Sequence, residues 1–119
     1  IIEPCGFQLN DKRLKKVAMD YLNKSKIKTY SSYENFLIKK KDSRIILMTT
    51  KAKKKYTNFK FNQKDTLLFG RESEGVPKIV HSNSYERLKI PLKKNARSLN
   101  IGMAVAVTLS EAVRQNSNL

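Results

Sequence analysis

The sequence predicts an α/β fold built on a mainly parallel sheet with helices on both of its faces. Residues 44–50 and 66–69 form largely apolar runs without alternation, a pattern typical of strands that a parallel sheet buries on both faces. Segments with helical spacing of apolar residues lie between such runs, which favours crossover connections through helices. The chain has 119 residues, 39% of them hydrophobic, which predicts one domain with one modest core.

The amino-terminal third predicts a strand end followed by two helices. The two opening isoleucines are typical of a buried strand already under way, so we expect one domain, residues 1–119, that lacks its amino-terminal strand and helix. Residues 12–22 show helical periodicity, and residues 27–30 predict a short polar strand near a sheet edge. Ser31 or Ser32 is expected to cap the second helix.

The middle of the sequence contains a basic segment and a glycine-containing loop. Residues 51–55 are predicted to be a basic loop, and residues 56–61 are weakly typical of a strand. Gly70 then begins a loop in which Gly75 permits a positive φ, and residues 78–81 predict a short helical turn. A glycine directly after a buried strand lets a ligand approach the backbone, although a tight turn explains the same residues equally well.

A strand, a basic turn and a long helix make up the last third. The strand is predicted over residues 88–92, and the helix is expected to begin with Ser98, Leu99 and Asn100. Residues 104–109 are apolar on nearly every side of that helix, so a second subunit is expected to cover what its own sheet leaves exposed. Ser98 alternatively serves only as the helix cap.

The charge balance is strongly basic. Lysine and arginine number 25 against 10 acidic residues, for a formal net charge of +15. This excess indicates a polyanionic partner such as nucleic acid, although an AT-rich genome that favours lysine codons explains the lysine content too. The expected phosphate contacts are basic residues of the first helix, the basic loop and the last helix: Lys12, Arg13, Lys15, Lys16, Lys51, Lys53, Lys54, Lys55 and Arg114.

The counts of cysteine and histidine, and the motifs that are missing, restrict the cellular location and the kinds of site that we expect. One cysteine excludes an internal disulfide, and the single histidine, His81, argues against a histidine-based metal site, so we expect a cytoplasmic setting and no metal. No run approaches the roughly 20 apolar residues that span a bilayer, so no membrane partner is expected. The Walker loop, the dinucleotide fingerprint and the nucleophile elbow are all absent from the sequence.

Three strand ends predict a ligand site. Because parallel strands end at one edge of a sheet, Met48, the loop at Gly70 and the segment from Ile90 to Leu92 are expected side by side. Backbone groups and apolar side chains at such an edge suit an adenosine-containing ligand held by main-chain hydrogen bonds.

These segments resemble motifs of a known class. Residues 68–77, Leu-Phe-Gly-Arg-Glu-Ser-Glu-Gly-Val-Pro, resemble the second motif of the SPOUT (SpoU/TrmH-type) RNA methyltransferases. Residues 90–92, followed by 96–100 and a helix ending at 111–115, resemble the third. Residues 1–7, together with 11–14 and 20–21, narrow the resemblance to the small, single-domain tRNA (cytidine-34) 2′-O-methyltransferases.

The resemblance implies a fold, an activity and a set of site residues. It implies a carboxyl-terminal trefoil knot, a homodimer, S-adenosyl-L-methionine as cofactor, and methylation of the ribose 2′-oxygen at the wobble position in the anticodon stem-loop of tRNA. The cofactor contacts that it implies are Met48, Gly70, Ile90, Leu92 and Ser98, with Ala104 adjoining. It also implies catalytic roles for Glu72, Ser98 and Asn100, and RNA contacts for Arg97 and Arg114.

The chain departs from the pattern at two places. The first motif of the class, with its asparagine and arginine, precedes residue 1, and Gly102-Met103 stands where Ser-Asn is usual. An rRNA-directed 2′-O-methyltransferase, a non-catalytic RNA-binding module and a basic structural protein of a ribosome are the competing interpretations. Saturable binding of S-adenosylmethionine separates a methyltransferase from the last two.

Overall fold

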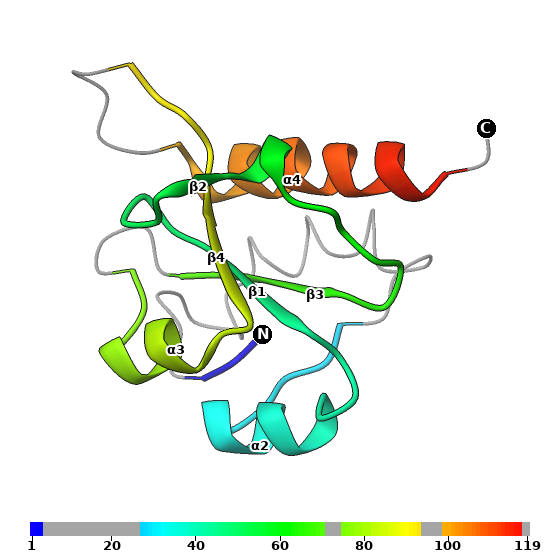
Figure 1. Cartoon of the computed structure of the whole chain (residues 1–119). Coiled ribbons are helices and arrows are strands. Elements are labelled where there is room, and N and C mark those ends of the chain that lie inside the picture. The colour runs from blue at the N-terminus through cyan, green and yellow to red at the C-terminus, as the bar shows by residue number, and fades with distance from the viewer. Residues whose placement is uncertain (4–26, 71–74, 94–98, 118–119) are drawn as a thin grey trace, which may run out of the picture. The chain divides into compact units, whose positions relative to one another are not determined.

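The computed structural model describes residues 1–3, 27–70, 75–93 and 99–117 (Figure 1). The chain divides into two compact units, Ile1–Lys41 and Asp42–Leu119. The helix expected over residues 12–22 lies outside the described residues.

In the described residues of the first unit, Ile2 and Tyr30 form a parallel bridge. The amide of Glu3 donates to the carbonyl of Tyr30 at 2.9 Å, and the amide of Tyr30 donates to the carbonyl of Ile1 at 2.8 Å. The strand predicted over residues 27–30 is therefore wrong except at its last residue. Residues 27–29 are exposed, so extended pairing there buries little apolar surface.

One short helix, α2 (Tyr33–Lys39), completes the described part of this unit. Its N-cap is Ser32, one of the two serines predicted, and the Ser32 hydroxyl accepts a hydrogen bond from the amide of Asn35 at 3.1 Å. Phe36 is buried and packs edge-to-face on Tyr30, with ring centroids 5.3 Å apart.

The second unit is built on a parallel four-stranded sheet, which confirms the predicted class. Its strands are β1 (Ile45–Met48), β2 (Lys54–Lys55), β3 (Thr66–Phe69) and β4 (Glu86–Lys89), in the order β2-β4-β1-β3. Every neighbouring pair is parallel. All four residues of β1 are buried, as predicted for this run, because β1 lies between two other strands.

Strand β3 has the predicted bounds but is only half-buried, because it lies at an edge of the described sheet. Three other predictions are wrong. The basic loop contains β2, the strand expected over residues 56–61 is a 3-10 turn (Tyr56–Asn58), and the last strand is β4 rather than residues 88–92. Proline at position 91 has no amide to donate, so pairing ends before it.

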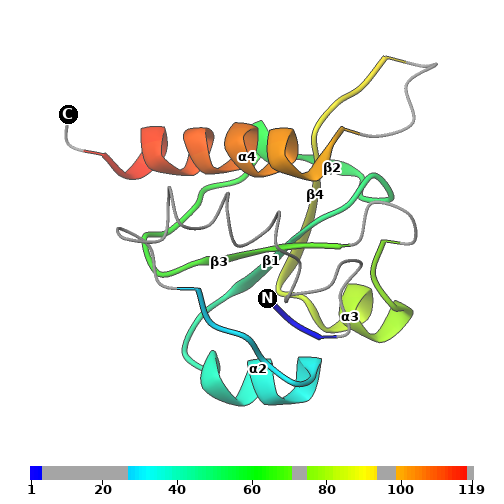
Figure 2. The same ribbon diagram turned by 180° about the vertical axis from the view of Figure 1, so that it is seen from behind.

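The core lies between the sheet and the last helix. Ile46, Met48, Phe61 and Leu88 form a buried cluster, and Ala112 of α4 (Ile101–Asn116) packs against it. Helix α4 also contacts β3. In Figures 1 and 2, α4 lies above β1 and β3, and α3 (Lys78–Asn83), the predicted helical turn, lies near the lower end of β4.

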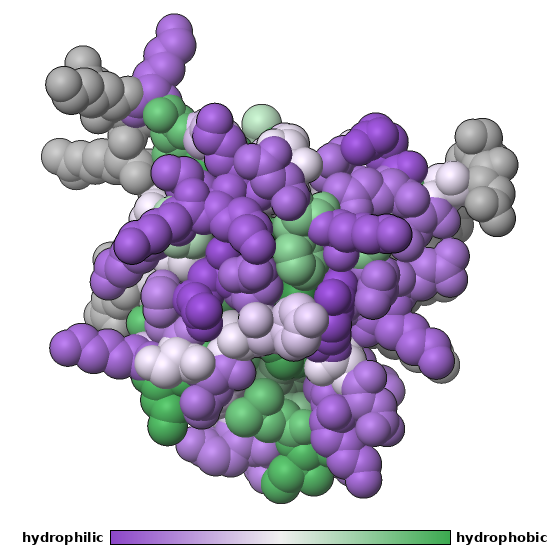
Figure 3. All heavy atoms as spheres, in the orientation of Figure 1, coloured by the Kyte–Doolittle hydropathy of each residue, from purple (hydrophilic) through white to green (hydrophobic). Residues whose placement is uncertain are grey.

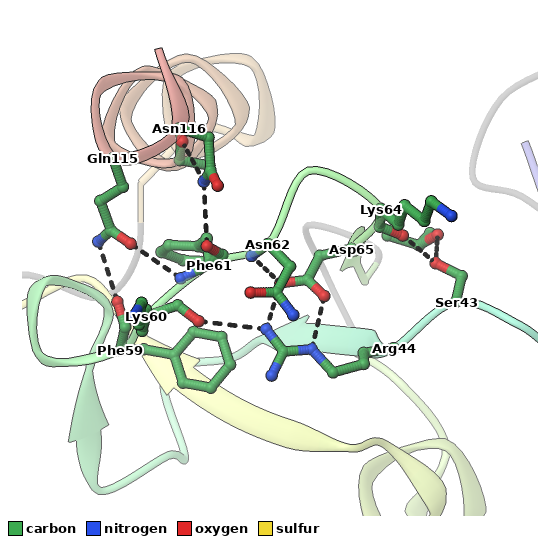
Figure 4. A network of polar contacts seen from close by, with 12 residues as sticks. Ser43, Arg44, Phe59, Lys60, Phe61, Asn62, Lys64, Asp65, Gln115 and Asn116 are labelled. Atoms are coloured by element: carbon green, nitrogen blue, oxygen red, sulfur yellow. Dashed lines mark hydrogen bonds and ion pairs between the residues drawn. The ribbon is translucent and has the colours of Figure 1, made fainter. Parts of the chain in front are cut away.

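The carboxyl end of α4 is tied to the segment that precedes β3. The side chain of Gln115 accepts from the amide of Phe61 at 2.8 Å and donates to the carbonyl of Phe59 at 2.9 Å (Figure 4). Asn116 donates from its side chain to the carbonyl of Phe61 at 3.0 Å. These bonds fix the helix against rotation and sliding, so its amino end has a defined place relative to the sheet.

A second set of polar contacts joins Arg44, which directly precedes β1, to the segment before β3. The guanidinium of Arg44 donates to both carboxylate oxygens of Asp65, each at 2.6 Å, and lies over the rings of Phe59 and Tyr85 at 5.1 and 4.8 Å. Burial alone raises the pKa of Asp65, but the bonds from Arg44 and from the amide of Asn62 outweigh it, so that pKa lies below its usual value. The ionised carboxylate therefore stabilises the fold.

We expect Asp65→Asn to lower the free energy of unfolding by about 2 kcal/mol at neutral pH, since a charge-assisted pair is lost. Asp65 has a depressed folded pKa, so its contribution is present above the unfolded pKa of about 3.9 and is lost as the pH falls through the folded value. Urea titrations at neutral and acidic pH measure this difference. Asp42→Asn, at an exposed position close to Arg44 in sequence, is the control and should change stability little. A deficit in Asp65→Asn that persists unchanged in acid contradicts the assignment.

Candidate active site

The carboxyl ends of three strands meet at one edge of the sheet. Met48, the last residue of β1, pairs with Phe69 of β3 on one side and with Leu88 of β4 on the other. The amide of Thr49 donates to the carbonyl of Leu88 at 2.8 Å, which extends the ladder one residue past β1. Met48, Gly70 and the segment from Ile90 are thus brought side by side, as predicted.

Gly70 follows β3 and is tightly enclosed by its own chain. A Cβ at this position would lie 2.7 Å from the carbonyl carbon of Gly75 and 2.8 Å from Cγ1 of Val76. Gly75 has the predicted positive φ, at 69°, which turns the chain back onto the strand end. Position 70 therefore requires glycine because Gly75 and Val76 leave no room for a side chain. The sequence had suggested that the glycine makes room for a ligand.

The chain leaves the sheet after β4, and this segment contains Ile90 and Leu92. Both are half-buried, and the Ile90 side chain packs against the core cluster, so this side chain serves the fold. Their peptide groups follow the last ladder residue, Lys89. Main-chain groups at this edge are therefore the candidates for contacts to a ligand.

Asn100 has a role that the sequence did not predict. It is the N-cap of α4, which begins at Ile101, so the expected start at residues 98–100 is wrong. The Asn100 side-chain oxygen accepts from the amide of Gly102 at 2.8 Å, and its carbonyl accepts from the amide of Ala104 at 2.9 Å. The oxygen is used by the cap, which leaves the amide nitrogen as the group able to donate to a ligand. The predicted residues Glu72, Arg97 and Ser98 lie outside the described residues.

Arg114 lies at the other end of α4, about 20 Å along the helix from Asn100. Its Nε and Nη2 donate to the carboxylate of Glu111 at 2.6 and 3.1 Å, while 71% of its side chain remains exposed. Its hydrogen bond to Glu111 raises the pKa of Arg114. The structure therefore does not bring Arg114 together with the strand-end residues.

Positively charged side chains that the sequence did not connect with this edge also lie here. Lys54 pairs in register with Leu88, and Lys55 with Lys89, so the basic segment borders β4. The signal was hidden because β2 has two residues, both exposed lysines, and no hydrophobic pattern. Among the residues that the structure describes, no cluster of three histidine, cysteine or acidic side chains fits a metal ion. No helix in the described ranges has the length and apolarity to cross a membrane.

The described edge is suited to binding and alignment. Ile90 and Leu92 are half-buried and leave some apolar surface here, Met48 is buried and offers its backbone, and the chain around Gly70 supplies peptide groups. None of these four residues has a side chain that exchanges a proton near neutral pH. Such an edge can hold a flat, partly apolar ligand with hydrogen-bonding ring atoms.

Comparisons with known proteins identify the class to which this arrangement belongs. Residues 1–110 match the SpoU rRNA Methylase family. A tRNA (cytidine(34)-2′-O)-methyltransferase of Beijerinckia indica is 42% identical over 117 residues, which cover 97% of this chain and 73% of that protein. The corresponding enzyme of Escherichia coli K12 is 32% identical over 97% of this chain and 74% of its own length.

Solved structures agree with the sequence comparisons. A structure described as giving insights into the 2-OH methylation of C/U34 on tRNA has a TM-score of 0.90 and 33% identity, covering 99% of this chain and 78% of its own. A solved structure of a protein from Bacillus anthracis has a TM-score of 0.82 and 37% identity, with coverages of 98% of this chain and 77% of its own. The chain belongs to the SpoU methylase family.

Proposed function

We propose that this chain methylates the 2′-oxygen of the ribose at wobble position 34 of tRNA, with S-adenosyl-L-methionine as methyl donor. The observation that carries the proposal is the meeting of Met48, Gly70 and Ile90 at one sheet edge, in a chain 42% identical to a cytidine-34 methyltransferase. The relatives extend beyond it, since the chain spans 73% of the first of them. Because tRNA is the substrate, the cytoplasm is its proposed location.

The residues of the described edge fit the proposed cofactor. Its adenine is flat and partly apolar, which suits the half-buried Ile90 and Leu92, and its ring nitrogens suit the peptide groups at Met48 and after β3 and β4. Bound there, the cofactor supplies an electrophilic methyl group on a sulfonium. Ser98 is proposed as a further contact, and the carboxyl-terminal part of the fold is proposed to form a trefoil knot.

The chemistry requires alignment more than covalent catalysis. Holding the ribose oxygen in line with the methyl group can contribute roughly 7–11 kcal/mol by orientation alone. The ribose hydroxyl is a weak acid, so it needs a base or a positive neighbour as it reacts. We propose that Glu72, Ser98 and Asn100 hold and polarise this hydroxyl. The amide nitrogen of Asn100 is the donor that its capping bond leaves available.

We further propose that the protein is a homodimer joined through α4. Four apolar side chains at every fourth position of this helix are substantially exposed: Ile101, Val105, Leu109 and Val113. They form one stripe, because residues four apart share a helix face. Soluble monomers seldom leave such a stripe uncovered, and a two-fold axis would bury it against its own copy.

Two measurements test the function. Calorimetry should show saturable binding of S-adenosylmethionine, and mass spectrometry of tRNA from a strain lacking the gene should show loss of the 2′-O-methyl group at position 34. Restoring the gene should restore the modification. Binding of RNA without binding of cofactor would instead support a non-catalytic RNA-binding module, and a missing methyl group in rRNA would support an rRNA-directed enzyme.

The basic charge gives a further expected result. If lysines and arginines contact phosphates, the logarithm of tRNA affinity should fall by roughly 0.7–0.9 for each contact per tenfold rise in salt. Filter binding of the anticodon stem-loop at several salt concentrations measures this slope. A slope near zero would assign the net charge of +15 to codon usage.

A further inference from the structure

The sequence predicts phosphate contacts for the lysines of residues 51–55, and the structure places these lysines together with Lys89 around the β2 edge of the second unit. We call Lys51, Lys53, Lys54, Lys55 and Lys89 the edge lysines. The first four are exposed and Lys89 is half-buried. Hydrophilic residues cover the region over β2 in the space-filling view (Figure 3).

These positive charges are weakly compensated. Lys54 forms an ion pair with Glu86 at 3.1 Å, and hydrogen bonds from Lys54 and the amide of Arg87 lower the pKa of Glu86 against the opposing effect of burial. Within the described part of the chain, no carboxylate is paired with Lys51, Lys53 or Lys55. The other paired carboxylates of this unit, on Asp65 and Glu111, are held by arginines elsewhere.

The edge lysines lie directly beside the candidate active site. Lys55 pairs in register with Lys89, whose next residue is Ile90. After Met48, a turn holds the start of the basic segment in place. The amide of Lys51 donates to the hydroxyl of Thr49 at 3.2 Å, and the amide of Ala52 donates to the carbonyl of Thr49 at 3.2 Å. The side chain of Ala52 is buried, so the neighbouring lysines emerge from a fixed backbone.

We propose that the edge lysines bind backbone phosphates of the RNA next to the ribose presented at the strand ends. This inference rests on the proposed function and names the protein surface that holds its substrate. Phosphates are the partner because lysines neutralise them without reading sequence, and because the lysines line the edge at which β1 and β4 end. The competing explanation is that charged residues protect an edge strand from pairing with other chains.

The first test compares two double variants that remove equal charge. Lys53→Ala/Lys55→Ala removes two edge lysines, and Lys60→Ala/Lys64→Ala removes two exposed lysines near the amino ends of β1 and β3, where their carbonyls bond Arg44 and Ser43. The proposal expects the first variant to weaken binding of the anticodon stem-loop about tenfold or more, and to reduce the salt slope by about one per lysine. The control should change both far less.

The second test increases the charge. Glu86→Gln keeps the side-chain shape and its acceptor oxygen for the amide of Arg87, but frees Lys54 from its counter-charge. Tighter RNA binding with a steeper salt slope is expected. Cofactor affinity should match the unmodified protein in each variant, because none of these side chains belongs to the core or to the proposed cofactor contacts. Melting temperature should be unchanged in the lysine variants and slightly lower in Glu86→Gln, which loses its ion pair with Lys54.

Two outcomes overturn the proposal. Equal losses in both double variants would mean that only net charge matters. Aggregation of Lys53→Ala/Lys55→Ala in light scattering, with unchanged RNA affinity of the folded fraction, would assign these lysines to edge protection. Failure of the proposed function is distinguishable, because it would appear as absent cofactor binding and absent methylation in the unmodified protein.

Discussion

Leu109→Glu is expected to convert the proposed dimer into a folded monomer. The Leu109 side chain is 50% exposed and lies in the apolar stripe of α4 between Val105 and Val113. A two-fold interface would lose this contact twice, each time about half of the roughly 1.5–3 kcal/mol that full burial of a leucine supplies, and would also gather two like charges. The dimer dissociation constant should therefore rise at least about a hundredfold. Light scattering at micromolar concentration measures the mass.

Two further variants separate the interface from the core. Val105→Glu, at an exposed position of the same stripe, should behave like Leu109→Glu. Val107→Glu changes a half-buried residue beside the fully buried Thr108, so it should unfold the chain, because a charge without a partner is costly inside a protein. Circular dichroism distinguishes a folded monomer from an unfolded chain. An unmodified protein that is monomeric at micromolar concentration would refute the proposed interface.

The same helix shows what hydrophobic content can and cannot predict. Residues 104–109 are apolar enough to predict an additional cover, and the structure does leave Val105 and Leu109 exposed. Yet Thr108, the polar residue of the run, is fully buried, and its hydroxyl has no hydrogen-bond partner within the described part of the chain. Composition predicts that a helix needs partners, whereas its rotation against the sheet decides which side chains meet them.

Strands were predicted correctly where their side chains are buried and the sequence is therefore continuously apolar. Strand β1 lies between two neighbours, so every side chain is buried and the run is apolar throughout. Strand β2 is held by backbone pairing to β4. Its two residues are exposed lysines, so no hydrophobic pattern in the sequence indicates this pairing. Short edge strands are therefore missed by hydrophobic patterning. The sequence predicted phosphate contacts for these lysines from their charge, but not their place beside β4.

The cap of α4 illustrates a second limit. Ser98 and Asn100 are both good N-cap residues, so local preference cannot choose between them. The structure chooses Asn100, whose side chain bonds the amide of Gly102. The predicted meeting of Met48, Gly70 and Ile90 needed only the parallel order of the strands, which explains why that part of the site was predictable.

Gly70→Val is expected to abolish measurable binding of S-adenosylmethionine and to lower the free energy of unfolding. Even the Cβ of alanine would lie 2.7 Å from the backbone of Gly75, so the strand end and the returning chain cannot both keep their places. Overpacking of this kind costs about 1–3 kcal/mol. Because the displaced backbone is also the proposed cofactor contact, affinity should fall at least about tenfold already in Gly70→Ala. Calorimetry measures the affinity, and urea titration measures the stability.

Gly75→Ala is the matched control, because it separates crowding from backbone strain. A Cβ on Gly75 meets nothing within 4 Å, so the substitution encounters only the positive φ of 69°, at a cost of about 1 kcal/mol. Gly75→Asn should cost less, since asparagine tolerates this conformation better than alanine. Cofactor affinity should therefore decrease in the order Gly75→Asn, Gly75→Ala, Gly70→Ala, Gly70→Val. Full affinity in a folded Gly70→Val variant would show that this strand end takes no part in binding the cofactor.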